Sequence, residues 1–204
     1  MSELGLFPLG LVLLPSEQVP LHIFEPRYQE LIGESLEQGI PFGIVYADDA
    51  GLREVGTLAT VTDVTERFED GRSNIIVEGG ERFRLVELTS GRSFVTASVE
   101  PFADQDDPAD EADIDRALAL FGRLAELTES DVVAPDRQTP EFSFSIAGRF
   151  ELAQELKQEL LTASSERVRL IRLCELLAIA AETVERQKEV ATRAQSNGKV
   201  HPPS

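Results

Sequence analysis

The chain has 204 residues, 42% of them hydrophobic and 27% charged, which is the composition of a soluble globular protein with an apolar core. Its formal net charge of −18 argues against nucleic acid as a partner, because binding to a phosphate backbone needs clustered lysine and arginine. No apolar run reaches the roughly 18 residues that span a bilayer. The first residues also lack the basic stretch of a secretory signal, so we expect a cytoplasmic protein with no membrane partner.

The first forty residues predict a buried strand, a second apolar piece and one short helix. Residues 6–14 are apolar but are interrupted by a proline and a glycine, which favours a strand entered by a turn. Residues 21–24 form the second piece. Pro26 suits the first helical position, where its missing N–H would be unpaired anyway, and Gly39 is a typical helix end. We therefore predict one amphipathic helix between them.

From residue 42 to residue 102 the pattern changes to strands. Over residues 82–88 the alternation of charged and apolar residues is imperfect, which indicates a bulge or an edge strand. Asp70-Gly71 is a hairpin signal, and Gly79-Gly80 reads as a turn between two strands. We predict an antiparallel sheet or partly closed barrel with strands over residues 42–47, 57–68, 74–78, 82–88 and 94–99.

The second half of the chain is predicted to be helical. Amphipathic spacing predicts a helix from residue 114, shorter segments over 142–152 and 155–162, and a long last helix capped by Ser164 and ending near Arg193. Strands followed by helices indicate an α+β fold. We predict a β subdomain, an acidic linker without hydrophobic periodicity, a helical subdomain and a disordered tail, over residues 1–103, 104–113, 114–193 and 194–204.

Several blocks of this sequence resemble the Lon N-terminal domain family. The opening blocks of that family are a Phe-Pro-Leu turn, an apolar strand that ends in proline, and a Pro-Leu-x-Ile-Phe-Glu-Pro-Arg-Tyr segment. They correspond here to Phe7-Pro8-Leu9, Val12 to Pro15, and Pro20 to Tyr28. Later blocks that look like the family's strand region and helical half are Val55-Gly56-Thr57, Val77-Glu78-Gly79, Arg82-Phe83, Ser145-Ile146-Ala147, Lys157 to Leu161 and Arg167 to Leu170.

The resemblance covers roughly residues 4–185 and implies a β subdomain of the PUA-like type (pseudouridine synthase and archaeosine transglycosylase), followed by a helical bundle. It also implies a non-catalytic module that binds unfolded or client polypeptides, with a AAA+ protease or chaperone as a further partner. The 204 residues contain no G-x-x-x-x-G-K-[ST] phosphate loop, so we expect no ATPase activity. They also stop before the point where the Ser–Lys peptidase of that family would begin, so we expect no peptidase activity.

We expect no catalytic, cofactor-binding or metal-binding residues, and no cofactor. The residues singled out for peptide contact come from the matching blocks and are Phe24, Glu25, Arg27, Tyr28, Arg82 and Phe83. Glu25, Arg27 and Tyr28 also have a structural interpretation, as a helix start in which Arg27 pairs with a carboxylate and Tyr28 packs toward the sheet. Cys174, the one cysteine, lies on an apolar helical face and is expected to be a buried hydrophobic residue.

Two alternatives remain open from the sequence. His22 with Glu25 could form a base and the residue that orients it in an unrecognised small hydrolase-type enzyme, although His22 is better explained by a structural hydrogen bond. RNA binding is known for other PUA-like folds, but the net charge opposes it.

Overall fold

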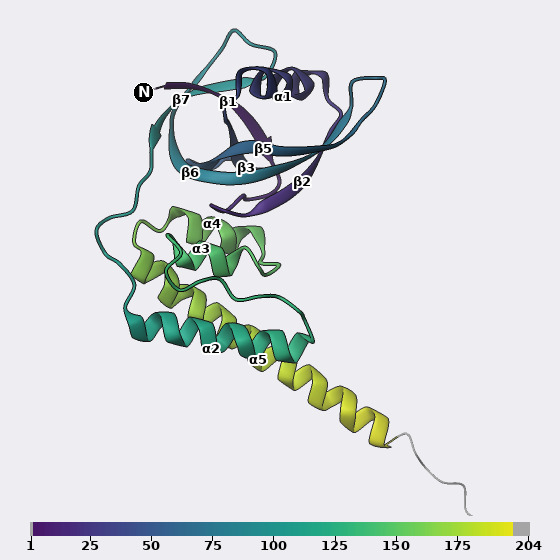
Figure 1. Cartoon of the computed structure of the whole chain (residues 1–204), viewed down its shortest axis with the longest axis vertical. Helices are drawn as coiled ribbons and strands as arrows, with labels where there is room; N and C mark the ends of the chain where they lie inside the picture. Colours follow the sequence, from purple (N-terminus) through teal and green to yellow (C-terminus); the bar gives the residue numbers. More distant parts are fainter. Residues whose placement is uncertain (1, 198–204) are drawn as a thin grey trace, which may run out of the picture.

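The computed structural model describes residues 2–197 of the chain. A β subdomain, with one helix across an end, stands on a helical subdomain, and the long last helix projects away from both (Figure 1). This arrangement confirms the predicted α+β fold, with an antiparallel β part first and a helical bundle with a long last helix after it. Within residues 2–197, no helix is both long enough and apolar enough to cross a membrane.

The strands form one sheet that closes on itself. Its path is β1-β7-β6-β5-β3-β4, and β1 also pairs with β3, in parallel, so that five strands make a ring. The short strand β2 pairs with β6 outside this path. The strands are β1 (Ser2–Leu9), β2 (Gln18–Ile23), β3 (Phe42–Asp48), β4 (Gly51–Leu52), β5 (Val55–Arg67), β6 (Ser73–Thr89) and β7 (Val95–Pro101).

The longest strand, β6, corrects one prediction. Gly79-Gly80 was expected to form a turn between two strands, but β6 runs through both glycines without a break. Gly79 is needed there because a Cβ atom at this position would lie 2.1 Å from the carbonyl oxygen of Leu14. The predicted irregularity in residues 82–88 is confirmed, since Val86 has no partner in the β6–β7 register. The hairpin at Asp70-Gly71 is confirmed as well.

Helix α1 (Pro26–Gln38) follows the sequence signals closely. Pro26 occupies its first turn and Gly39 ends it in the left-handed conformation, with φ of 66°. The apolar face, including Leu31 and Ile32, packs on the core of the β subdomain. In Figure 1 the helix lies across the end of the barrel that faces away from the helical subdomain.

The helical subdomain contains α2 (Glu111–Thr128), α3 (Phe142–Ala147), α4 (Gln154–Thr162) and α5 (Glu166–Asn197). The last helix is capped by Ser165, not by Ser164 as predicted: the Val168 N–H donates to Oγ of Ser165 at 3.1 Å. The predicted tail begins at residue 194, but residues 194–197 are helical, and residues 198–204 lie outside the described part.

The segment predicted as an acidic linker is tied to the helices. Helix α2 begins at Glu111, within that segment. Asp107 accepts hydrogen bonds from Ser165 and Arg167 at the start of α5, and Asp104 is paired with Arg169. The domain boundaries stay a prediction, but the segment holds the two subdomains together and is more than a solvated spacer.

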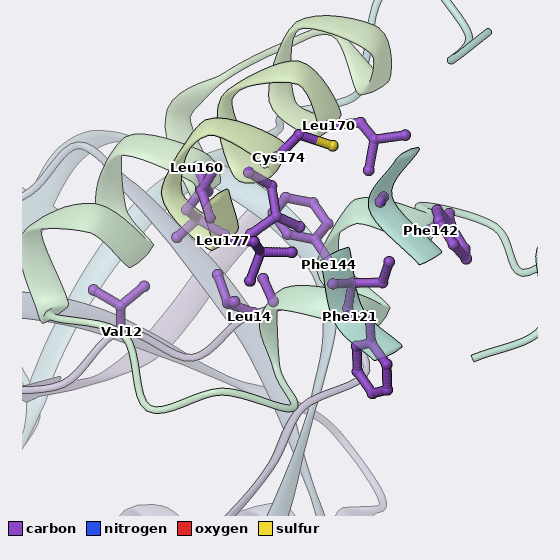
Figure 2. Close-up of a cluster of buried hydrophobic side chains, with 14 of the residues drawn as sticks. Val12, Leu14, Phe121, Phe142, Phe144, Leu160, Leu170, Cys174 and Leu177 are labelled. Atoms are coloured by element: carbon purple, nitrogen blue, oxygen red, sulfur yellow. The ribbon is translucent and has the colours of Figure 1, made fainter. Parts of the chain in front are cut away.

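One hydrophobic cluster joins the two subdomains. Val12, Leu14, Tyr46 and Val55 come from the β subdomain and are buried in the same cluster as side chains from all four C-terminal helices. Figure 2 shows Val12 and Leu14 of the β subdomain in this cluster, together with Leu160 of α4 and Leu177 of α5. Because burial of apolar surface is the main stabilising term in folding, this shared core fixes how the subdomains are oriented.

Candidate functional site

An exposed aromatic surface lies at the end of β2 and the tip of the β5–β6 hairpin. We define it by His22, Phe24 and Phe68. The Phe24 ring stacks on the His22 ring, with centroids 5.9 Å apart and planes at 19°, and Phe68 meets His22 edge-on at 6.2 Å. Phe24 is 59% exposed and belongs to none of the hydrophobic core clusters. A large apolar ring held in water this way is a typical feature of a binding surface.

Local hydrogen bonds hold the aromatic surface in place. His22 pairs with Asn74 in the β2–β6 register, and His22 Nδ1 and Asn74 Oδ1 share a hydrogen bond of 2.6 Å. The backbone oxygen of Phe24 accepts a hydrogen bond of 3.1 Å from the side-chain amide of Gln29 in α1. Phe68 closes the hairpin through its backbone, and the Arg72 guanidinium lies 5.1 Å from its ring centroid. The rings are therefore pre-organised.

A hollow of about 170 Å³ adjoins this surface, between α1 and the β5–β6 hairpin. Its apolar walls include Ile32, Leu36, Val64 and Phe68. Leu36 is itself exposed, so apolar surface continues from the aromatic rings into the hollow. A depression of this size accepts a side chain and not a whole small molecule, since ligand pockets usually have several hundred Å³.

Of the predicted contact residues, Glu25 and Arg27 lie beside Phe24. Both are substantially exposed, and Arg27 donates to Glu25 at 2.7 and 3.0 Å. Tyr28 is only 5% exposed, because its ring packs on Phe7 with centroids 4.0 Å apart. Burial raises the pKa of the Tyr28 phenol, against the lowering effect of Arg27. The Tyr28 ring is therefore part of the core of the β subdomain.

The other two predicted contact residues, Arg82 and Phe83, are buried. Phe83 packs in a small core cluster of the β subdomain. Arg82 is 3% exposed and donates to the carbonyl oxygens of Leu161 and Ala163 at 2.8 Å each, and to Asp104. Desolvation lowers the pKa of Arg82, and the charge of Asp104 opposes that shift. Its guanidinium fastens the β subdomain to the end of α4.

A second buried arginine, Arg169 of α5, completes this junction and was not singled out from the sequence. It has no exposed surface, and it donates to Asp104 at 3.0 and 2.5 Å, to Glu166 at 2.6 Å and to Ser143 at 2.7 Å. Its guanidinium also lies 4.0 Å from the ring centroid of Phe144. A single arginine in an amphipathic helix carries no local signal of burial, so pattern reading could not find it.

The region around His22 offers little for acid–base chemistry. The Glu25 carboxylate is bound by Arg27, and the contacts of His22 are two aromatic rings and Asn74. The His22–Glu25 pairing considered for an enzyme is thus replaced by two separate pairs. This agrees with the structural interpretation of His22.

A groove of about 640 Å³ lies at the junction of the subdomains, next to the arginine pair. Its walls include Pro15, Pro101 and Phe102, and its rim carries Glu81 and Glu141. An adjoining groove of about 550 Å³ shares Ser16 with it. Together they follow the seam between the two subdomains.

Comparison with known proteins assigns the family. The family model of the ATP-dependent protease La (LON) substrate-binding domain matches residues 3–178. A Lon protease of Paraburkholderia phytofirmans is 27% identical over 208 aligned residues, which cover 93% of this chain and 25% of that protein. A Lon protease of Porphyromonas gingivalis is 26% identical over 196 residues, which cover 86% and 23%. The chain thus spans about a quarter of the length of these relatives.

Two solved structures show the same fold. A Lon N-terminal domain protein from Xanthomonas campestris superposes with a TM-score of 0.67 at 24% identity, covering 85% of this chain and 97% of that one. The N-terminal domain of the Mycobacterium avium complex Lon protease gives a TM-score of 0.67 at 17% identity, covering 87% and 98%. With the family model matched over most of its length, the chain belongs to the Lon substrate-binding domain family.

Proposed function

We propose that this chain is a non-catalytic module that binds unfolded or client polypeptides through the aromatic surface. The observation that carries the proposal is the exposed Phe24 ring, held by His22 and set beside an apolar hollow. Unfolded chains display apolar side chains that folded proteins bury, so such a surface distinguishes the two. The description of the matched family as a substrate-binding domain supports the proposal.

The energetic basis is burial of apolar area. Covering apolar surface contributes about 25 cal/mol for each Å² removed from water. Aromatic side chains that are already rigid lose little conformational entropy on binding, which is why they dominate binding hot spots. Phe24 and the hollow can each hold one apolar group of an extended chain, and the exposed pair of Glu25 and Arg27 forms a polar edge.

Of the six residues expected in peptide contact, we therefore propose three as contacts, Phe24, Glu25 and Arg27. Tyr28, Arg82 and Phe83 are proposed to act indirectly, by holding the surface and the subdomain junction. We further propose that a client bound here is delivered to a AAA+ protease or chaperone. Capture of such a machine by the purified chain would test that part separately.

The binding proposal is tested with a permanently unfolded protein such as reduced casein, labelled for fluorescence anisotropy. Phe24→Ala and Phe68→Ala should each weaken binding about tenfold or more, as truncation of a hot-spot aromatic does. Val190→Ala is the matched control, because Val190 is 62% exposed but lies on α5, far from the aromatic surface. Absence of binding at high micromolar concentration, or equal weakening by the control, would contradict the proposal.

A further inference from the structure

We propose that the groove at the subdomain junction is a second polypeptide-binding surface, which takes an extended segment carrying lysine or arginine side chains. This inference rests on polypeptide binding as the function of the chain. It uses none of the residues of the aromatic surface, so the two proposals can fail separately.

One edge of β6 is open beside this groove. Strand β2 covers this edge up to the pair Gln18–Glu78, and β7 covers it from the pair Pro101–Phe83 onward. Between them, Gly80 and Glu81 have no strand partner in the described registers. No strand covers this stretch, so an extended peptide has room to lie along it beside the groove.

The opening is built into the sheet as a bulge. Two residues of β6, Gly80 and Glu81, stand opposite the single residue Leu58 of β5. Bulges occur often next to functional sites, because they turn side chains away from the regular ladder. At Gly80 the missing side chain leaves the backbone approachable, since the nearest atom to a Cβ placed there is the Leu58 carbonyl oxygen at 3.5 Å.

The two sides of the opening are fixed by backbone hydrogen bonds. On one side Ser16 N–H donates to the Gly79 oxygen at 2.7 Å, and on the other Phe102 N–H donates to the Arg82 oxygen at 3.0 Å. The groove between them, about 640 Å³, continues past Ser16 into the adjoining groove of about 550 Å³. The continuous path suits a peptide segment better than a compact small molecule.

The charged residues that line the groove are predominantly acidic. Glu81 and Glu141 are exposed on the rim, and neither forms a salt bridge among residues 2–197. Partial burial raises the pKa of Glu141, against the lowering effect of the charges of Arg82 and Arg169. The one cation in the lining, Arg82, is neutralised by Asp104. In the adjoining groove the charges of Asp136 and Arg149 offset each other. Asp104 and Glu166 already balance the two buried arginines, so Glu81 and Glu141 leave the junction with a net negative charge, which complements a basic segment and repels an acidic one.

The test uses two extended peptides of equal length, rich in threonine and glutamine and free of aromatic residues, one carrying lysines and the other glutamates. Binding is measured by fluorescence anisotropy at about 0.15 M salt. The basic peptide should bind, and the acidic peptide should not. The double substitution Glu81→Gln and Glu141→Gln should weaken the basic peptide by roughly three- to tenfold, since exposed ion pairs are individually modest.

The matched control removes two carboxylates elsewhere. Glu126 and Asp131 are exposed on the helical subdomain away from the groove, so Glu126→Gln with Asp131→Asn makes the same change in net charge. This control should weaken the basic peptide less than twofold. Equal weakening by both double variants would show that the peptide responds only to the net charge of the whole chain. That result would overturn the proposed binding of the peptide in the groove. Equal binding of the two peptides would also overturn it, while Phe24-dependent casein binding would leave the proposed function standing.

Discussion

Arg169 of α5 binds Asp104, which follows β7, through two parallel hydrogen bonds of 3.0 and 2.5 Å. The same carboxylate pairs with Arg82 of β6, so one aspartate joins two buried guanidinium groups from different subdomains. Both cations are withdrawn from water, and their charge is tolerated only because Asp104 and Glu166 compensate it.

Removing this carboxylate should destabilise the whole chain. Asp104→Asn leaves two buried arginines with too little compensating charge, which typically costs about 3 kcal/mol or more of unfolding free energy. Urea unfolding followed by circular dichroism measures the change. Asp106→Asn is the control, because Asp106 is an exposed neighbour in the same loop, and it should leave the midpoint nearly unchanged. Equal effects of the two substitutions would refute the role of the junction.

The pairing of Asp104 with the two buried arginines makes the free energy of unfolding depend on pH. Desolvation alone would raise the pKa of Asp104, but hydrogen bonds and charges from Arg169 and Arg82 outweigh it and hold the pKa below its ordinary value of 3.8. A carboxylate with a lowered folded pKa contributes its full stability above the unfolded pKa and loses it as the pH falls through the folded value. Unfolding free energy should therefore fall below about pH 4 in the natural chain, with a smaller slope in Asp104→Asn.

Local signals account for what the sequence predicted well. Helix α1 was predicted with both ends correct, because Pro26 and Gly39 act within a few residues of themselves. The fold class and the family block around Phe24 were also predicted from local signals. Each depends on residue order and spacing, which are visible without a structure.

Sequence patterns did not show the structural roles of residues whose interaction partners lie far away along the chain. Gly79-Gly80 resembled a turn, but Gly79 is required by the carbonyl of Leu14, a contact that only the folded barrel creates. Arg82 was singled out for peptide contact only because it lies in a block that resembles the family, and it is buried. Its burial depends on Asp104 and on carbonyl groups at the end of α4, some eighty positions later. No periodicity in the sequence records such partners.

The two adjacent glycines of β6 should respond differently to alanine. Gly79→Ala would force the loop at Leu14 away and strain the hydrogen bonds that Ser16 and Glu17 make with residue 79, so we expect a loss of about 2 kcal/mol. Gly80→Ala meets only an ordinary contact at 3.5 Å and should change stability by less than about 0.5 kcal/mol. Thermal unfolding of both variants decides the matter, and similar losses would contradict the packing described.

Phe24 and Tyr28 should separate binding from stability. Tyr28→Ala removes a buried ring that contacts Phe7 and should cost about 3 kcal/mol, while Tyr28→Phe should be well tolerated. Phe24→Ala removes an exposed ring and should change the unfolding free energy by no more than about 0.5 kcal/mol. A large loss of stability in Phe24→Ala would mean that the ring serves folding, and would remove it from the proposed binding surface.

Cys174 reports on the integrity of the helical subdomain. Its thiol is fully buried in the cluster that joins the subdomains, and burial raises its pKa, against the lowering effect of Arg116. Because only the exposed thiolate reacts, labelling by a thiol reagent such as dithiobis-nitrobenzoate should be slow in the native chain and fast in urea. Asp104→Asn should speed labelling in native buffer, since the thiol becomes accessible when the subdomain opens. If labelling is instead rapid in the natural chain and unchanged by Asp104→Asn, then the helical half opens without release of the arginine junction, and that junction cannot be what holds the two subdomains together.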